Sequence, residues 1–201
     1  MPPLSKELEL YVRNIKNLCK NKYLVVAGRN SPRKRILETI QKYNQFSKLD
    51  SPYLIVLSDI PRNNIPKSKK IIYLGLQSPL VARKIISDSL GLIHLDQYDW
   101  CPNIVVAACF DKVPIICSNY GGTKEIVKSN GIVINEFPDN LPSNIEGMQF
   151  ARNSRIPNKL FVDALDRLLF EPRSFEMNNK LFMHNTSMSY INVFKKVLDL
   201  K

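Results

Sequence analysis

The sequence predicts an α/β fold: a doubly wound parallel sheet with helices on both of its faces. Short runs of β-branched and other apolar residues alternate along the chain with longer amphipathic stretches. The run at 23–27 is apolar at every position, which is typical of a strand that is buried on both faces. Connections of helical length between such runs favour a parallel sheet, because parallel strands need a crossover that a helix provides.

The expected elements follow this alternation through most of the chain. Further strands are expected at 53–57, 71–74, 92–95, 114–117 and 132–134. Apolar residues recur at helical spacing at 5–19, 33–46, 79–89, 102–110 and 123–128, where helices are expected. Pro and Asn residues between 136 and 157 predict an irregular loop, and two more helices are expected at 158–170 and 175–200. We therefore expect one domain over residues 1–201, with its core at about 23–136 and its C-terminal helices at about 158–200.

The chain is strongly basic. Its 29 Lys and Arg residues outnumber the 18 Asp and Glu residues, which gives a net charge of +11. This balance favours an anionic partner, such as nucleic acid, an acidic membrane surface or a phosphorylated small molecule; solvated lysines on helix faces are an equal alternative. The basic residues do not interleave with aromatic residues as a base-stacking surface requires, which disfavours nucleic acid.

Sequence patterns also exclude several classes of protein. No stretch reaches the roughly 18 to 20 apolar residues that span a bilayer, and the first residues lack the apolar region of a secretory signal. We therefore expect a cytoplasmic protein whose cysteines are free thiols. The four cysteines and two histidines are not spaced as zinc ligands, so no metal site is expected.

Ligands of doubly wound sheets bind at the carboxyl ends of the strands, so the loops there are the candidate sites. The loop after the first strand contains Gly28, Arg29 and Lys34. Its two cations flank a strand-to-helix turn, where unpaired N–H groups suit a phosphate. The loop is neither a GxGxxG motif nor a P-loop, and a basic surface loop is an equal alternative.

Two glycines mark the loop after the expected strand at 114–117. Gly121 and Gly122 precede Thr123 and Glu125 at a strand-to-helix junction. A tight turn needs one glycine, whereas two allow a backbone to approach a ligand closely, so this pair favours ligand binding.

The loop after the expected strand at 92–95 carries two carboxylates, Asp96 and Asp99, and the only tryptophan, Trp100. A carboxylate here can accept hydrogen bonds from sugar hydroxyls, beside an aromatic ring that covers an apolar sugar face. Capping of the next helix and solvation at the surface are the alternatives.

Together these motifs resemble, from about residue 23 to 136, the donor-binding C-terminal domain of the GT-B glycosyltransferases of the large retaining family 4 (glycosyl transferases group 1). That domain is Rossmann-like and forms one half of a GT-B fold. The matching segments are Gly28-Arg29 with Lys34, Leu74-Gly75, Asp88, 101–106, 114–116, 121–127 and, in the tail, 189–195.

The resemblance implies transfer of a sugar from a nucleotide-diphospho-sugar, such as a UDP-sugar or GDP-sugar, with retention of configuration and without a metal. Arg29 and Lys34 would then stabilise the departing diphosphate, and Asp99 would orient the sugar. Donor binding is further assigned to Gly28, Asn103, Gly121, Gly122, Thr123, Glu125 and Gln77, with Leu76 and Leu80 beside Gln77 at the base and Glu125 fixing the start of its helix.

Two departures from the family favour a second hypothesis. The family's pair of glutamates falls on Asp99 and Ala107, and alanine cannot bond a ribose, a loss typical of ~1.5 to 3 kcal/mol. The chain also holds only one of the two GT-B domains, so the acceptor would need an N-terminal domain or a partner chain. The alternative is therefore a catalytically impaired nucleotide- or partner-binding module, half of a split glycosyltransferase. Lipid-linked acceptors are common in the family, which adds peripheral membrane contact to the expectations.

Overall fold

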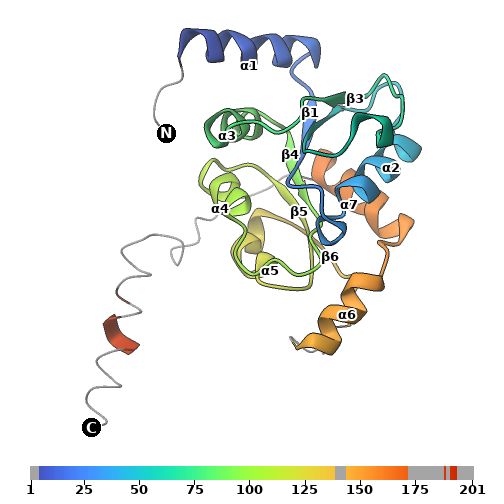
Figure 1. Cartoon of the computed structure of the whole chain (residues 1–201), viewed down its shortest axis with the longest axis vertical. Coiled ribbons are helices and arrows are strands. Elements are labelled where there is room, and N and C mark those ends of the chain that lie inside the picture. Colours follow the sequence, from blue (N-terminus) through green and yellow to red (C-terminus); the bar gives the residue numbers. More distant parts are fainter. Residues whose placement is uncertain (1–4, 139–143, 172–187, 189–190, 194–201) are drawn as a thin grey trace.

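Six parallel strands form one sheet in the order β3-β2-β1-β4-β5-β6 (Figure 1). The computed structural model describes residues 5–138, 144–171, 188 and 191–193. The strands are β1 (Tyr23–Ala27), β2 (Tyr53–Leu57), β3 (Ile71–Tyr73), β4 (Gly91–His94), β5 (Ile115–Ser118) and β6 (Gly131–Ile134). The predicted fold class, a doubly wound α/β sheet, is confirmed.

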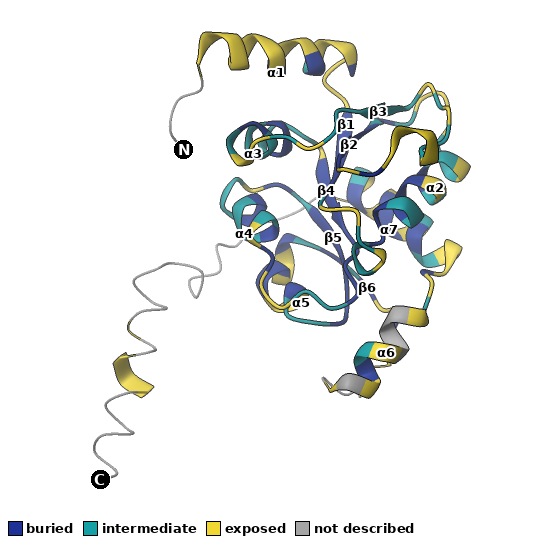
Figure 2. Ribbon diagram, viewed as in Figure 1, coloured by how far each residue is buried: buried dark blue, intermediate teal, exposed yellow. Residues whose placement is uncertain are grey.

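Helices cover both faces of this sheet, as the alternation of its side chains requires. Val25 of β1 packs in a buried cluster with α1 (Lys6–Leu18), α3 (Pro79–Ser87), α4 (Asn103–Phe110) and α5 (Thr123–Val127). Its neighbour Leu24 packs on the other face with α2 (Ile36–Phe46) and α7 (Asn158–Phe170). Figure 1 shows α3, α4 and α5 on one side of the strands and α2 and α7 on the other. Figure 2 shows the central strands β1, β4 and β5 as buried, whereas the edge strand β3 is of intermediate exposure.

Strand β1 lies at the centre, where it pairs with β2 on one side and with β4 on the other. The chain runs outward from β1 to β3 and then crosses back to β4. The loops that follow β1 and β4 therefore diverge from adjacent strand ends, which opens a crevice at this topological switch point. The candidate site lies at this edge.

The expected helix at 33–46 begins later than its periodicity predicts. Residues Pro32–Lys34 form a 3₁₀ turn, Arg35 adopts a left-handed conformation with φ of 50°, and α2 begins at Ile36. A left-handed non-glycine residue costs roughly 1 to 2 kcal/mol. The buried guanidinium of Arg35 offsets this cost, because its Nη1 lies 2.5 Å from Glu136 Oε2 and its Nη2 donates to Ser154 Oγ.

The prediction of an irregular loop over 136–157 is wrong in part, because the segment contains the helix α6 (Ile145–Asn153). Asn144 had indicated a loop, but its side chain accepts a hydrogen bond from Gly147 N–H and so caps α6. The next expected helix is confirmed as α7. Of the expected helix at 175–200, the described residues are Met188 and 191–193, which are helical; the rest, with most of the tail match at 189–195, lies outside the described residues.

The other strand and helix ends agree with the predicted ends to within one or two residues, the usual uncertainty of such boundaries. Among the described residues, no helix has the length and apolar character needed to cross a membrane.

Candidate functional site

Lys34 lies where the loops after β1 and β4 meet. Its Nζ is 2.6 Å from Asp96 Oδ2 and 2.6 Å from Asp99 Oδ2, although Lys34 and Asp99 are 65 residues apart in sequence. Arg33 adds a second cation, with Nη1 at 3.6 Å from Asp96 Oδ2. We call Arg33, Lys34, Asp96 and Asp99 the Lys34 cluster. Backbone atoms join the same loops, since Gln97 N–H donates to the Arg33 carbonyl.

Burial and charge act against each other in this cluster. The Asp96 side chain is 0% exposed, and burial raises its pKa, an effect that the bond and charge of Lys34 reduce. The Asp99 side chain is 18% exposed, and burial, the largest single effect, favours its neutral form. The bond and charge of Lys34, with smaller contributions from neighbouring groups such as Arg33, together hold its pKa below the ordinary value. With both carboxylates ionised, two cations face two anions, so the cluster is close to neutral.

His94 lies at the end of β4, close to both carboxylates. His94, Asp96 and Asp99 each offer one ligand atom within 4.8 Å of the others, which makes them the residues of the described chain that could hold a metal ion. The ammonium of Lys34 already supplies positive charge to these carboxylates. Burial, helped by the charge of Lys34, lowers the His94 pKa to about 4, so the ring is neutral at pH 7.

The two glycines after β5 serve loop packing. Gly121 has φ of 83°, and a Cβ on Gly122 would lie 2.0 Å from the Trp100 carbonyl oxygen. Gly122 N–H donates to the Asp99 carbonyl, and Thr123 Oγ1 donates to the same oxygen at 3.4 Å. The pair therefore does lie beside Asp99, but it fixes the Asp99 backbone, and the Gly122 N–H is already bonded within the protein.

The other predicted site residues lie around the cluster. Arg29 points outward, with a side chain 79% exposed and Nη1 at 3.6 Å from Asp59 Oδ2. Gly28 directly follows β1 and has φ of 150°, and Asn103 is the exposed first residue of α4. Gln77 donates to the Leu74 carbonyl at 2.7 Å, which ties down the loop after β3.

Glu125 lies in the first turn of α5, where its backbone N–H donates to the Gly122 carbonyl and its side chain is exposed. Thus the structure brings Lys34, Asp99 and the 121–123 segment together. It does not bring Arg29, Gln77 or Glu125 into contact with the two carboxylates.

Asp96 and Arg33 were not selected from the sequence. Asp96 stands in the same loop as Asp99, and nothing in the spacing of the two carboxylates indicates which one is buried. Arg33 was part of a visible basic triplet, 33–35, whose three members have different roles. Arg35 pairs with Glu136 on the opposite side of the loop, whereas Arg33 faces Asp96.

An apolar pocket of about 420 Å³ opens between α3 and α4. It is lined by Pro79, Ala82, Arg83, Ile86, Asn103, Ile104, Ala107 and Ala108. Ala107 therefore faces this pocket, one turn beyond Asn103 and close to the loop that carries Asp99. Leu76, Gln77 and Leu80, which were expected at a base pocket, are not among its walls; the α3 wall begins at Pro79.

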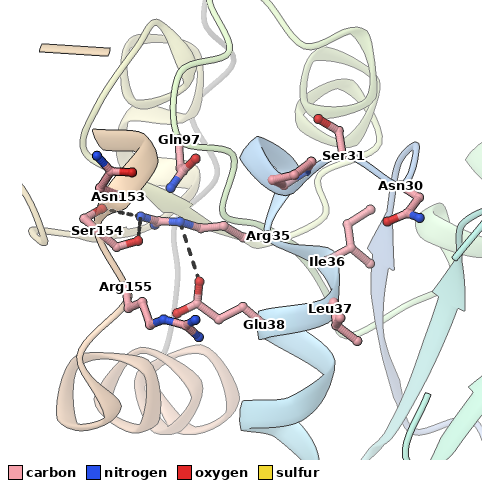
Figure 3. A pocket seen from close by; sticks show the side chains of 11 residues that line it. Asn30, Ser31, Arg35, Ile36, Leu37, Glu38, Gln97, Asn153, Ser154 and Arg155 are labelled. Carbon is pink, nitrogen blue, oxygen red and sulfur yellow. Dashed lines mark hydrogen bonds and ion pairs between the residues drawn. The ribbon is translucent and has the colours of Figure 1, made fainter. Parts of the chain in front are cut away.

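A second pocket, of about 470 Å³, lies on the α2 side of the same loop. Figure 3 shows Arg35 crossing it, with dashed contacts to Ser154 and Glu38, while Asn30 and Ser31 lie on the other side of the view. The guanidinium of Arg35 in this pocket is paired with Glu136 and Ser154. The Lys34 cluster, in contrast, lies at the topological switch point, where ligands of such sheets bind.

Comparisons with known proteins place the fold. No protein-family model matches the sequence, and no curated protein matches it either. Solved structures do match. The trehalose-phosphate synthase (UDP-forming) from Burkholderia vietnamiensis superimposes with a TM-score of 0.66 at 11% identity, over 98% of this chain and 51% of that one.

Two further structures agree with this comparison. A glycosyltransferase from Rickettsia africae matches with a TM-score of 0.57 at 16% identity, over 98% of this chain and 53% of that one. HepE of Anabaena, solved in complex with UDP-glucose, matches with a TM-score of 0.53 at 14% identity, over 94% and 53%.

At sequence identities this low, the structural similarity shows the fold alone. The chain spans about half the length of the structures it matches. The expectation of a Rossmann-like domain that corresponds to one half of a GT-B fold is confirmed. Membership of family 4 stays a prediction.

The pH dependence of stability should report the neutral state of His94. Because its pKa is about 4 in the folded chain and about 6.5 when unfolded, the unfolded chain binds more protons between these values. Stability therefore falls as pH drops through this window, by about 2 kcal/mol from pH 7 to pH 5. Urea unfolding of the wild type and His94→Gln at both pH values measures this difference, which the variant should lack. Equal pH dependence in the two proteins would contradict a neutral buried His94.

Proposed function

We propose that this chain is the donor-binding half of a glycosyltransferase that takes a nucleotide-diphospho-sugar, such as a UDP-sugar or GDP-sugar. The observation that carries the proposal is the meeting of Lys34 and Asp99. Sequence reasoning assigned these residues, from two separate loops, to the diphosphate and the sugar, and their side chains lie 2.6 Å apart at the switch-point edge. The similarity of the fold to a glycosyltransferase, and to HepE solved in complex with UDP-glucose, supports the same conclusion.

The charges at this edge suit departure of a nucleoside diphosphate. Negative charge grows on the leaving diphosphate, and fixed cations in a partly buried site stabilise it. Lys34 is such a cation, with Arg33 beside it. Helix α4 begins at Asn103 without a side-chain cap from any described residue, so its first N–H groups add to the anion site. The exposed Arg29, loosely paired with Asp59, can turn toward the outer phosphate.

In this proposal Asp99 accepts hydrogen bonds from hydroxyls of the transferred sugar. Its carboxylate is partly exposed, and its backbone is fixed by Gly122 and Thr123. Retention of configuration and action without a metal complete the proposal. Both follow the family resemblance, and the positive charge that a metal would bring to the diphosphate is supplied here by Lys34, Arg33 and Arg29.

The nucleoside is proposed to occupy the apolar pocket between α3 and α4. Ile86 and Ile104 offer apolar surface to a base, and Asn103 offers polar atoms at the pocket mouth. Ala107 leaves the ribose without the carboxylate that the family places there. Donor affinity is therefore expected to be low, which favours the second candidate function, a nucleotide-binding module that acts within a larger assembly.

The acceptor is proposed to bind outside this chain, because the chain spans about half of the glycosyltransferases it matches. An N-terminal acceptor-binding domain or a partner chain would supply that part. The described elements share one sheet and its covering helices, which supports one nucleotide-sugar-binding domain over residues 1–201. A cytoplasmic location with peripheral membrane contact through basic helix faces belongs to the same proposal, whereas nucleic acid does not.

Lys34→Ala should weaken the binding of UDP or GDP by about tenfold to a hundredfold, since it removes a charge-assisted hydrogen bond from the phosphates. Calorimetric titration without metal, using UDP, GDP, ADP and their sugar conjugates, measures the change. Lys42→Ala is the matched control: Lys42 lies on α2, and its ammonium donates to Asn158, away from the site. Equal losses in the two variants, or no nucleotide bound by the wild type at millimolar concentration, would contradict the proposal.

Ala107→Glu should restore a ribose contact and tighten UDP binding by roughly tenfold, the value of one charge-assisted hydrogen bond. Inorganic pyrophosphate has no ribose, so its affinity should not rise in the same titrations. A variant that binds UDP more weakly, or that binds both ligands more tightly, would place the nucleoside elsewhere.

A further inference from the structure

The two carboxylates that share Lys34 differ in what surrounds them. The Asp96 side chain is fully buried. Its Oδ1 is hydrogen-bonded, and its Oδ2 is held by ion pairs with the two cations without meeting the geometry of a hydrogen bond. Oδ1 accepts a hydrogen bond from Tyr98 N–H at 3.3 Å, while Oδ2 lies 2.6 Å from Lys34 Nζ and 3.6 Å from Arg33 Nη1. A carboxylate enclosed in this way cannot reach a ligand at the edge of the sheet.

Asp99 is held differently. Its backbone is fixed, because the Asp99 carbonyl accepts hydrogen bonds from Gly122 N–H and Thr123 Oγ1. Its carboxylate, however, is partly exposed and is bonded to Lys34. Rotation of the side chain alone would therefore move this carboxylate from Lys34 to a ligand without disturbing the loop.

The free-energy cost of losing the contact with Lys34 also differs between the two carboxylates. A fully buried carboxylate without a cation is strongly unfavourable, whereas a carboxylate that reaches solvent can be rehydrated. An anion that competes for Lys34 will therefore displace Asp99 and leave Asp96 in place. With both carboxylates ionised the cluster is close to neutral before binding, and one phosphate oxygen then takes the place of the Asp99 oxygen on the ammonium.

From this asymmetry we infer that Asp96 is a positioning residue that holds Lys34 permanently, and that the donor diphosphate displaces Asp99 from Lys34 and so frees Asp99 to bind the sugar. The inference rests on the proposed function and adds an order to it. Phosphate contact comes first and releases the sugar-binding carboxylate. A sugar without a diphosphate finds Asp99 still paired.

Two charge-matched variants separate this exchange from a general effect of charge. Asp96→Asn and Asp99→Asn each remove one negative charge from the same cluster. If charge alone mattered, both would bind UDP more tightly. The exchange predicts opposite changes. Asp99→Asn removes the competitor and should tighten UDP binding about threefold, whereas Asp96→Asn removes the anchor, leaves Lys34 paired with Asp99 and should weaken it about fivefold. Asp99→Asn should also abolish any preference for the UDP-sugar over UDP.

Tighter UDP binding by both variants, or weaker binding by both, would overturn the inference. Thermal unfolding of each variant checks that it is folded. If Asp96→Asn does not fold, Asp96→Ser replaces it, because the serine hydroxyl removes the charge and still offers an acceptor near Tyr98 N–H.

A measurement without any ligand keeps the inference separate from the proposed function. The rate at which acetic anhydride acetylates Lys34, followed by mass spectrometry with Lys42 as internal reference, reports how firmly its ammonium is held. The rate should rise more in Asp96→Asn than in Asp99→Asn. If the wild type binds no nucleotide but this order is found, the proposed function fails and the anchor stands. If the rate in Asp96→Asn equals that of the wild type, the anchor is refuted whatever the nucleotide result.

Discussion

One partly buried ammonium shared by two carboxylates joins the loops that form the proposed binding site. Lys34 belongs to the loop after β1, and Asp96 and Asp99 belong to the loop after β4. The second loop is in turn bonded to the segment after β5, through Gly122 N–H and the Asp99 carbonyl. The ionic contact and this backbone contact therefore hold three loops together at one edge of the sheet. The sheet order makes the arrangement feasible, since it puts β1, β4 and β5 side by side.

The strands and helices could be predicted from the sequence because the spacing of their apolar residues indicates which side chains are buried. The strand at 23–27 is apolar throughout and is buried throughout, and α7 follows the spacing of its apolar residues. The loops that carry Lys34 and Asp99 could be proposed as one site because parallel strands put their carboxyl ends on one edge, and the family resemblance then selected these two residues.

The remainder depends on contacts between distant residues that no local pattern encodes. Asp96 and Asp99 are alike in sequence, and only the packing of the loop decides which is enclosed. Arg35 breaks a helical pattern because Glu136, 101 residues away, holds its guanidinium. Gly121 and Gly122 were assigned to ligand binding from the sequence, but the close approach they permit in the structure is to the 99–100 backbone of this chain.

The balance between an active enzyme and a binding module depends on Ala107 and on where the proposed acceptor binds. Under the proposal, the Lys34 cluster binds the negative charge of a diphosphate, which either function would use. Weak nucleoside contact at the α3–α4 pocket would reduce donor affinity, yet a partner that closes over the carboxyl edge would exclude water and strengthen the same charges. Such an assembly would make the activity of this chain depend on its partner.

The most direct test of the central claim is to map nucleotide binding on the ¹⁵N-labelled chain by NMR. Added UDP or GDP should shift amide signals in the loops 28–34, 96–104 and 119–123. The nucleoside of either ligand should also shift signals of the residues that line the α3–α4 pocket. Signals of α1 and of the pocket crossed by Arg35 should move little. Shifts centred on Arg35 and Ser154, or none in the three loops at saturating nucleotide, would contradict a donor site at the switch-point edge.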